Sequence, residues 1–286
     1  MPENLRVLRR KREIVGEIRQ ITRAMKLVSA AKLKRALNWR DAAHEYDTAL
    51  EETLAVVAAH AGEIEHPFLV ERPVERVGLL LVAGDKGLCG AFNASIISAA
   101  RRWVRGIGAR VNTVTVGTRS AEMARRARLH VVREFPAINE RERGTDAQEI
   151  ARYVMGMFER DEVQQVHACY ARFLSRINNE PDVRQILPVP LPEPEADAQP
   201  HIFEPSAPEL AQKLIPQYVV ARVFEVLLSS AASEHSARLM AMTAATENAE
   251  EMIGDLTRGI NRARQANITR DLLDIAAGAD ALGQRA

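Results

Sequence analysis

The last quarter of the chain, from about Glu209 to Leu282, constrains the fold more than any other segment. It contains a single proline, Pro216, near its start, and strong helix formers (Ala, Leu, Met, Glu, Gln and Arg) dominate it. An unbroken helix of this length would be roughly 100 Å long at ~1.5 Å per residue. Such a helix cannot bury itself inside one compact domain, so it must lie against a partner helix, against other chains or in water.

The start of the chain, from about Asn4 to His60, is the candidate partner helix. It contains no proline and one glycine, Gly16. Apolar or small residues recur close to a heptad spacing, which is typical of a coiled-coil seam. We therefore expect segments 1–62 and 209–286 to pair as an antiparallel coiled coil. The expected seam residues are Leu8, Val15, Ile18, Met25, Ala36, Trp39, Ala43, Tyr46, Leu50 and Val57, with the polar Thr22, Ser29 and Lys32 at further seam-like positions.

The segment between the two helices, roughly 76–190, has a different period. Short apolar runs alternate with amphipathic stretches, which predicts a mostly parallel sheet covered by helices and thus an inserted Rossmann-like α/β domain. A connector rich in proline and acidic residues follows at 188–208. The expected strands are 77–83, 111–117, 130–135 and 163–173, with a return through 184–187, and the expected helices are 94–104, 120–128 and 146–160.

The charge is unevenly placed along the chain. The net charge is only +1, but Arg and Lys greatly outnumber Glu in residues 1–40, which predicts an acidic partner surface. The two cysteines, Cys89 and Cys169, are far apart, which favours a reducing compartment. We find no apolar run of membrane-spanning length and no apolar signal core, so we expect a soluble, cytoplasmic protein.

A glycine-rich loop, Gly84–Gly90, follows the first expected strand and invites a phosphate-binding interpretation. It matches neither G-x-x-x-x-G-K-[S/T] nor G-x-G-x-x-G. We therefore expect Gly84, Gly87 and Gly90 to serve a turn that needs positive φ and close packing. Glu234 and His235 on the long last helix could suggest acid–base chemistry, but a partner-contacting face is the more common use. We expect no catalytic, cofactor or metal site.

Three stretches point to a known family. They are Ile18–Lys32 (IRQITRAMKLVSAAK), Asp85–Asn93 (DKGLCGAFN) and Ser233–Ala249, the last continuing through 261–269. With the helix–α/β–helix layout, they make nearly the whole chain resemble the gamma subunit of the F-type ATP synthase. The loop departs modestly from many relatives at Asp85-Lys86 and Ala91-Phe92.

The resemblance implies a non-catalytic, central rotating shaft that couples proton (or sodium) flow to ATP chemistry on the beta subunits. The implied partners are three alpha and three beta subunits, the epsilon subunit and the membrane c-subunit ring, with no cofactor, no nucleic acid and no direct membrane insertion. The implied location is the cytoplasmic face of the bacterial inner membrane. The coupling ion and the direction of operation stay open.

The resemblance also implies partner contacts residue by residue. Arg23, Met25 and Lys26 match positions that face the acidic lever loop of beta, and residues past Ala279 would lie in the apolar sleeve of the ring. The positions matching the catch-loop contacts of beta are Arg238, Gln265 and Thr269, and those matching the rotor-ring side are Phe203 and Glu204.

Two alternatives remain from the residues alone. The chain could be a stand-alone coiled-coil scaffold or a nucleic-acid-associated protein that uses its basic first helix. It could also be an α/β nucleotide-binding enzyme, a hypothesis that depends only on the loop Gly84–Gly90.

Overall fold

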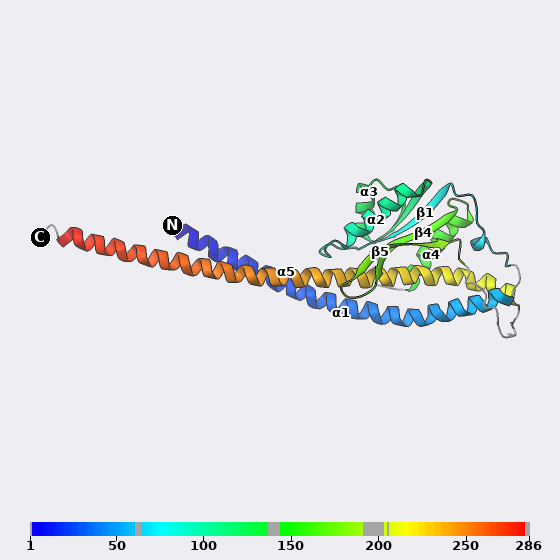
Figure 1. Cartoon of the computed structure of the whole chain (residues 1–286), viewed down its shortest axis with the longest axis horizontal. Coiled ribbons are helices and arrows are strands. Elements are labelled where there is room, and N and C mark those ends of the chain that lie inside the picture. Colours follow the sequence, from blue (N-terminus) through cyan, green and yellow to red (C-terminus); the bar gives the residue numbers. More distant parts are fainter. Residues whose placement is uncertain (1, 61–63, 137–143, 191–202, 205, 284–286) are drawn as a thin grey trace. The chain divides into compact units, whose positions relative to one another are not determined.

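The computed structural model of the chain describes residues 2–60, 64–136, 144–190, 203–204 and 206–283, with side chains from residue 5 to residue 277 (Figure 1). It divides into two compact units: unit 1 comprises residues 1–28 and 241–286, and unit 2 comprises residues 29–240. The sleeve contact expected past Ala279 and most of the connector after Pro190 lie outside the described side chains. Each unit is described by itself below.

Two long helices supply residues to both units. Helix α1 spans Pro2–His60 and helix α5 spans Ala207–Gly283. Helix α5 begins slightly earlier than expected, because the hydroxyl of Ser206 accepts the main-chain N–H of Glu209 at 3.4 Å. Pro208, which the sequence analysis placed in the connector, lies in the first turn of α5. The main-chain N–H groups of a first turn have no partner within the helix, so proline costs no hydrogen bond there.

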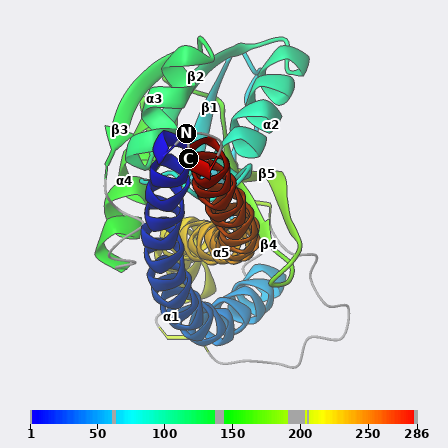
Figure 2. The ribbon, with the colours of Figure 1, turned by 90° about the vertical axis from the view of Figure 1, so that its left-hand side faces the viewer.

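In unit 1, α1 and α5 pair in antiparallel directions. The Thr246 hydroxyl donates to the Thr22 hydroxyl at 2.9 Å, and Leu8 lies beside Gly259. This register leaves the end of α5, from about residue 266, beyond the start of α1 (Figure 1). Viewed end-on, the start of α1 and the end of α5 lie at the same end of unit 1, as antiparallel pairing requires (Figure 2).

In unit 2, the continuation of the same two helices is also antiparallel, and it is more apolar. Leu33 and Ala36 pack against Ala232. Farther along α1, Leu50 and Leu54 enter the main core with residues of α5. Bulky apolar side chains therefore hold the helices together here, in contrast to the threonine pair of unit 1.

The predicted seam is correct at one of its two positions and wrong at the other. The series that contains Thr22, Ser29, Ala36 and Leu50 faces the partner helix, with these four residues buried. The residue three places later and the residue four places later both lie on the same side of the helix, so spacing alone does not say which of them completes the seam. In the structure the residues four places later are buried, namely Leu33, Asp47 and Leu54. Three of the residues three places later, which were predicted in the seam, are exposed: Ile18 (47%), Trp39 (51%) and Tyr46 (56%).

The α/β part of unit 2 confirms the predicted sheet and its Rossmann-like order. The five strands are ordered β3-β2-β1-β4-β5, with β1 to β4 parallel and β5 antiparallel at one edge. The strands are β1 (Arg76–Val82), β2 (Arg110–Val116), β3 (Val131–Phe135), β4 (Gln165–Phe173) and β5 (Asn179–Leu187). The helices are η1 (Pro67–Leu69), α2 (Phe92–Gly106), α3 (Thr118–Arg126) and α4 (Gly144–Glu159).

The two faces of the sheet build two separate cores, because successive residues of β1 point to opposite sides. Leu79 and Leu81 pack with α2 and α3. Leu80 and Val82 pack with α4, α5 and the last turns of α1. Helix α5 thus serves as a core helix of the α/β part and as the partner of α1.

The apolar character of α5 exceeds what the sequence analysis expected. Within the described residues, α5 holds an 18-residue window with a mean hydropathy of 1.3, long and apolar enough by composition to cross a bilayer. Because 61% of that window is buried inside the protein, a core helix explains its composition.

Candidate partner-contact surfaces

Unit 1 has a narrow, partly polar seam. Thr22 and Thr246 are each 8% exposed, and the Thr246 hydroxyl also contacts the carbonyl oxygen of Met242 at 2.7 Å. Small residues such as Ala249 let the two backbones approach closely. The seam therefore buries little apolar surface, and most of the larger side chains of unit 1 point outward.

Those outward side chains are unusually apolar for a free helix pair. Large hydrophobic residues are 46–70% exposed along both helices of unit 1. An exposed apolar surface of this extent is typical of a protein–protein contact. Its members are Val7, Ile14, Ile18, Ile21, Leu27 and Val28 on α1, and Met252, Ile268, Leu272, Leu273 and Ile275 on α5.

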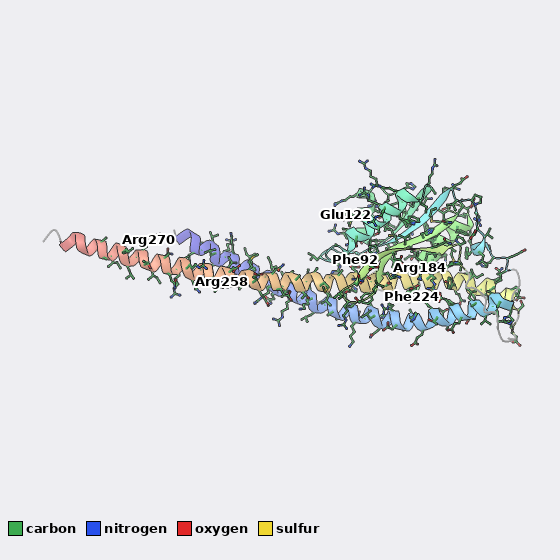
Figure 3. All side chains as sticks on the ribbon, viewed as in Figure 1. Phe92, Glu122, Arg184, Phe224, Arg258 and Arg270 are labelled. Atoms are coloured by element: carbon green, nitrogen blue, oxygen red, sulfur yellow. The ribbon has the colours of Figure 1, made fainter. Side chains whose placement is uncertain are left out.

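Basic side chains are interspersed with these apolar residues. Arg258 and Arg270 project from α5 (Figure 3), and Arg258 pairs with Asp255 on its own helix. On α1, an exposed basic cluster occupies the first three turns that carry side chains. Its members are Arg6, Arg9, Arg10, Lys11 and Arg12.

Five of the predicted beta-contact residues lie on unit 1. Arg23, Gln265 and Thr269 are exposed, and Met25 and Lys26 are half-buried. Gln265 and Thr269 are four residues apart and share one side of α5. The structure therefore leaves the two expected catch-loop residues of unit 1 accessible on one helical face.

Arg238, the sixth predicted contact residue, differs from these five. It lies in unit 2, and its side chain is only 10% exposed. Its guanidinium group donates to Glu234 Oε1 at 2.6 Å and to the carbonyl oxygen of Gly87 at 3.3 Å. The Arg238 side chain therefore ties α5 to the glycine loop.

The loop Gly84–Gly90 is held by side chains from three helices. The Asn93 side chain accepts the Gly84 N–H at 2.8 Å, and Asp85 accepts the N–H of Thr118 at 2.8 Å. Gly90 has a φ of +58°, and a Cβ at Gly84 would lie 3.0 Å from the Glu234 carboxylate. Gly87 has neither a positive φ nor a close neighbour to a Cβ, and its main-chain oxygen accepts a hydrogen bond from Arg238.

The same geometry makes the loop a poor phosphate site. The carboxylates of Asp85 and Glu234 lie at the loop, where they would repel a phosphate. Arg238, the nearby cation, is already bonded to Glu234. Within the described residues, no cluster of His, Cys, Asp and Glu could hold a metal ion.

The residues expected on the rotor-ring side lie in unit 2. The Phe203 ring lies 5.4 Å from the His60 ring, centroid to centroid, and packs beside the main core. Glu204 is exposed. The pair therefore marks the place where the chain reaches the end of α1 before it enters α5.

A charge cluster between α1 and α5 in unit 2 was missed by the sequence analysis. Arg222 pairs with Glu51 on α1 and with Glu225 at 2.8 Å on α5. Asp47 is 6% exposed beside this cluster, and burial raises its pKa to about 6 although the Arg222 charge acts in the opposite direction. The heptad pattern gave no signal for this site, because the expected seam contained Tyr46 and not Asp47.

The comparisons with known proteins agree with one another. A family model described as ATP synthase matches residues 4–282. The ATP synthase gamma chain of Desulfitobacterium hafniense is 39% identical over 277 residues, covering 97% of this chain and 98% of the relative. That of Pelotomaculum thermopropionicum is 37% identical over 281 residues, covering 98% and 99%.

Solved structures share the fold. A chain of the Euglena gracilis mitochondrial ATP synthase (OSCP/F1/c-ring, rotational state 3) has a TM-score of 0.72 at 16% identity, covering 99% of this chain and 95% of that one. A chain of the Tetrahymena thermophila central stalk and c-ring has a TM-score of 0.62 at 21% identity, covering 79% and 99%. On the full-length sequence matches, this chain belongs to the ATP synthase gamma chain family.

Proposed function

We propose that this chain is the central rotating shaft of an F-type ATP synthase, coupling ion flow through the membrane rotor ring to ATP synthesis or hydrolysis on the beta subunits. The observation that carries the proposal is the match to gamma chains over 97% of the chain, extending through both long helices. The exposed apolar and basic surface of unit 1 supports it, because a ring of partner subunits would cover that surface.

The chemistry of unit 1 suits a part that must turn. A shaft has to leave each partner subunit and meet the next, so tight, fully buried polar contacts would hold it at one angle. Charge attraction falls off gradually with distance and varies more smoothly with angle than a hydrogen bond does. Arg23 and Lys26 on α1 fit such long-range attraction to an acidic lever on beta, with the half-buried Met25 between them.

The sharper contact with beta is assigned to Gln265 and Thr269, which are exposed on one side of α5. Arg238 has a different proposed role. Because it is bonded to Glu234 and Gly87 inside unit 2, it would hold the glycine loop on α5, and a contact with beta would use only its small exposed part.

The remaining partners follow the family. Phe203 and Glu204 would lie on the side of the c-subunit ring, with the epsilon subunit against the α/β part. The chain itself would be non-catalytic, since carboxylates occupy the only loop whose sequence invited a nucleotide. The complex would lie on the cytoplasmic face of the bacterial inner membrane, with this chain peripheral to the bilayer.

Reconstitution tests the proposal. The full chain is mixed with alpha and beta subunits from the same source, and ATPase activity and subunit stoichiometry are measured at low and at about 0.5 M salt. We expect one copy of this chain per hexamer, raised hydrolysis and retention at high salt. A chain that forms no complex, or that binds nucleic acid in a steeply salt-dependent way instead, would contradict the proposal.

Bulky substitutions test the contact assignment. Gln265→Trp and Thr269→Trp should slow ATP-driven rotation in single-molecule assays while the complex still assembles. Gln265→Ala removes the amide without adding bulk, so it separates the loss of the amide from the effect of added volume. Normal torque and turnover in both Trp variants would refute the assignment of these two residues.

A further inference from the structure

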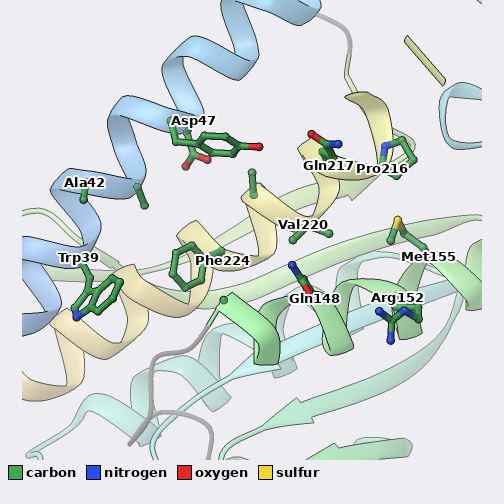
Figure 4. Close-up of a pocket in the computed structure, with 14 residues that line it drawn as sticks. Trp39, Ala42, Asp47, Gln148, Arg152, Met155, Pro216, Gln217, Val220 and Phe224 are labelled. Atoms are coloured by element: carbon green, nitrogen blue, oxygen red, sulfur yellow. The ribbon is translucent and has the colours of Figure 1, made fainter. Parts of the chain in front are cut away.

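Unit 2 contains a cavity between its helices. It has a volume of about 680 Å³, within the range of roughly 300–1,000 Å³ typical of small-molecule sites. Three helices line it: α1, α4 and α5 (Figure 4). Much of the lining is apolar, supplied by Trp39, Tyr46, Met155, Val220 and Phe224.

Two large aromatic side chains at this cavity are about half exposed. Trp39 is 51% exposed and Tyr46 is 56% exposed, although both are large enough to be buried usefully. They are the residues that the heptad pattern wrongly assigned to the helix seam. In the structure both line the cavity, and Trp39 is labelled there in Figure 4.

One buried carboxylate also lines the cavity. Asp47 is 6% exposed overall and belongs to the wall of the cavity. Such a group usually gains a partner when it is buried, because an unpaired buried charge is strongly unfavourable. Burial raises the pKa of Asp47 to about 6, although the charges of Arg222 and His44 act in the opposite direction.

The cations near Asp47 form their ion pairs with other carboxylates. Arg222 on α5 is shared by Glu51 of α1 and Glu225 of α5. Arg184 of β5 pairs with the same Glu225 at 3.0 Å. Three carboxylates therefore lie near two guanidinium groups, both of which are engaged. The other charged or titratable groups around Asp47 are His44 on α1, Arg152 on α4 across the cavity, and Arg40, Asp41 and Arg172 on its other side.

We propose that this cavity binds a small organic cation, a protonated amine carried on an aromatic or branched apolar body. The ammonium group would pair with Asp47 and lie against the rings of Trp39 and Tyr46, since aromatic faces attract cations. The apolar body would fill the space between Val220 and Phe224. The ligand should carry its positive charge at one end only. The Asp47 carboxylate lies at one wall of the cavity, whereas Arg152 at another wall would repel a second positive charge.

Binding would also stiffen unit 2. The ligand would contact α1, α4 and α5 at once, and these helices belong to the same compact unit. A ligand that binds only the folded state raises its stability in proportion to the logarithm of its concentration. The site would thus offer a way to change the rigidity of this part of the chain without touching the surface of unit 1.

The test uses the full chain carrying Trp103→Phe, so that Trp39 is its only tryptophan. The probes are 4-phenylbutylamine and its neutral analogue 4-phenylbutanol, followed by Trp39 fluorescence and by calorimetry at about pH 7.5. We expect saturable 1:1 binding of the amine and at least about tenfold weaker binding of the alcohol. Equal binding of the two probes, or no saturable binding of the amine, would overturn the proposal.

Two variants and a pH series complete the test. Asp47→Asn, which is close in shape, should remove the preference for the amine, whereas Asp41→Asn, a change of an exposed carboxylate outside the cavity, should leave it intact. With a pKa of about 6 for Asp47, affinity for the amine should fall about tenfold between about pH 7.5 and pH 5, while the amine stays protonated. A preference that survives in Asp47→Asn, or that Asp41→Asn also abolishes, would refute the assignment.

Discussion

Replacing Asp47 by asparagine should stabilise this protein, although most substitutions of buried residues destabilise a fold. Burial raises the pKa of Asp47 from its ordinary value of 3.8 to about 6, so the folded state favours the protonated carboxyl. Above that pKa the folded chain must hold a charge that burial disfavours more than the nearby Arg222 favours it. Asparagine has nearly the same shape and carries no charge, so the variant avoids this penalty.

The size of the effect follows from the two pKa values. Their difference corresponds to roughly 3 kcal/mol of lost stability at about pH 8. The buried amide of the variant carries a desolvation cost of its own, about 1 kcal/mol, which leaves a net gain of about 2 kcal/mol. The sign follows from proton binding. Because the folded state holds this proton more tightly than the unfolded state, the contribution of Asp47 to wild-type stability is highest below about pH 4 and falls as pH rises through about 6.

Urea unfolding followed by tryptophan fluorescence measures this, because Trp39 and Trp103 both lie in unit 2. The gain of Asp47→Asn over the wild type should be largest at about pH 8 and should shrink by roughly two-thirds at about pH 5, because the charge penalty roughly halves there while the cost of the buried amide stays the same. Asp41→Asn, on the exposed side of the same helix, is the matched control and should change stability little. A gain that does not vary with pH, or a loss at pH 8, would refute the reasoning.

Three other substitutions or reagents test the remaining features of unit 2. Arg238→Met removes the cation beside the buried Glu234 and should cost about 3–5 kcal/mol, whereas combining it with Glu234→Gln should cost less; a double variant as unstable as the single one in urea would contradict this. Gly117→Ala should prevent folding, as judged by circular dichroism, because φ is +98° and the new Cβ would lie 2.2 Å from a carbonyl oxygen at the end of β1. Burial raises the pKa of the Cys169 thiol to about 12 and also raises the pKa of the Cys89 thiol. Neither thiol should therefore react with a chromogenic disulfide at about pH 8 until the chain is unfolded. Rapid labelling of the native protein would contradict this prediction.

The elements of this fold were predictable because each has a local cause. The period of the apolar residues changes from helical to strand-like and back, and glycines and prolines mark the changes. The strands expected at 77–83, 111–117, 130–135 and 163–173 and the return strand are all present. Proline at position 208 was misjudged, because the rule that proline ends a helix does not apply in a first turn.

The candidate surfaces were predictable only through the family resemblance. Nothing in the local pattern distinguishes Gln265 and Thr269 from other polar residues of a long helix. The bonds of Arg238 to Glu234 and Gly87 were not predicted from the sequence. Those two partners lie four and more than one hundred residues away in the sequence, and the second contact exists only after the sheet has formed.

The sequence by itself determined the two long helices, the α/β segment between them and the excess of basic residues at the start, because these depend on propensity, period and composition. Only the tertiary structure decided which side of α1 faces α5. A heptad pattern allows either the residue three places or the residue four places after each seam residue to complete the seam. Packing against α5 buried the residue four places later. That choice buried Asp47 and exposed Trp39 and Tyr46, and so created the cavity from residues that the sequence had assigned to other places.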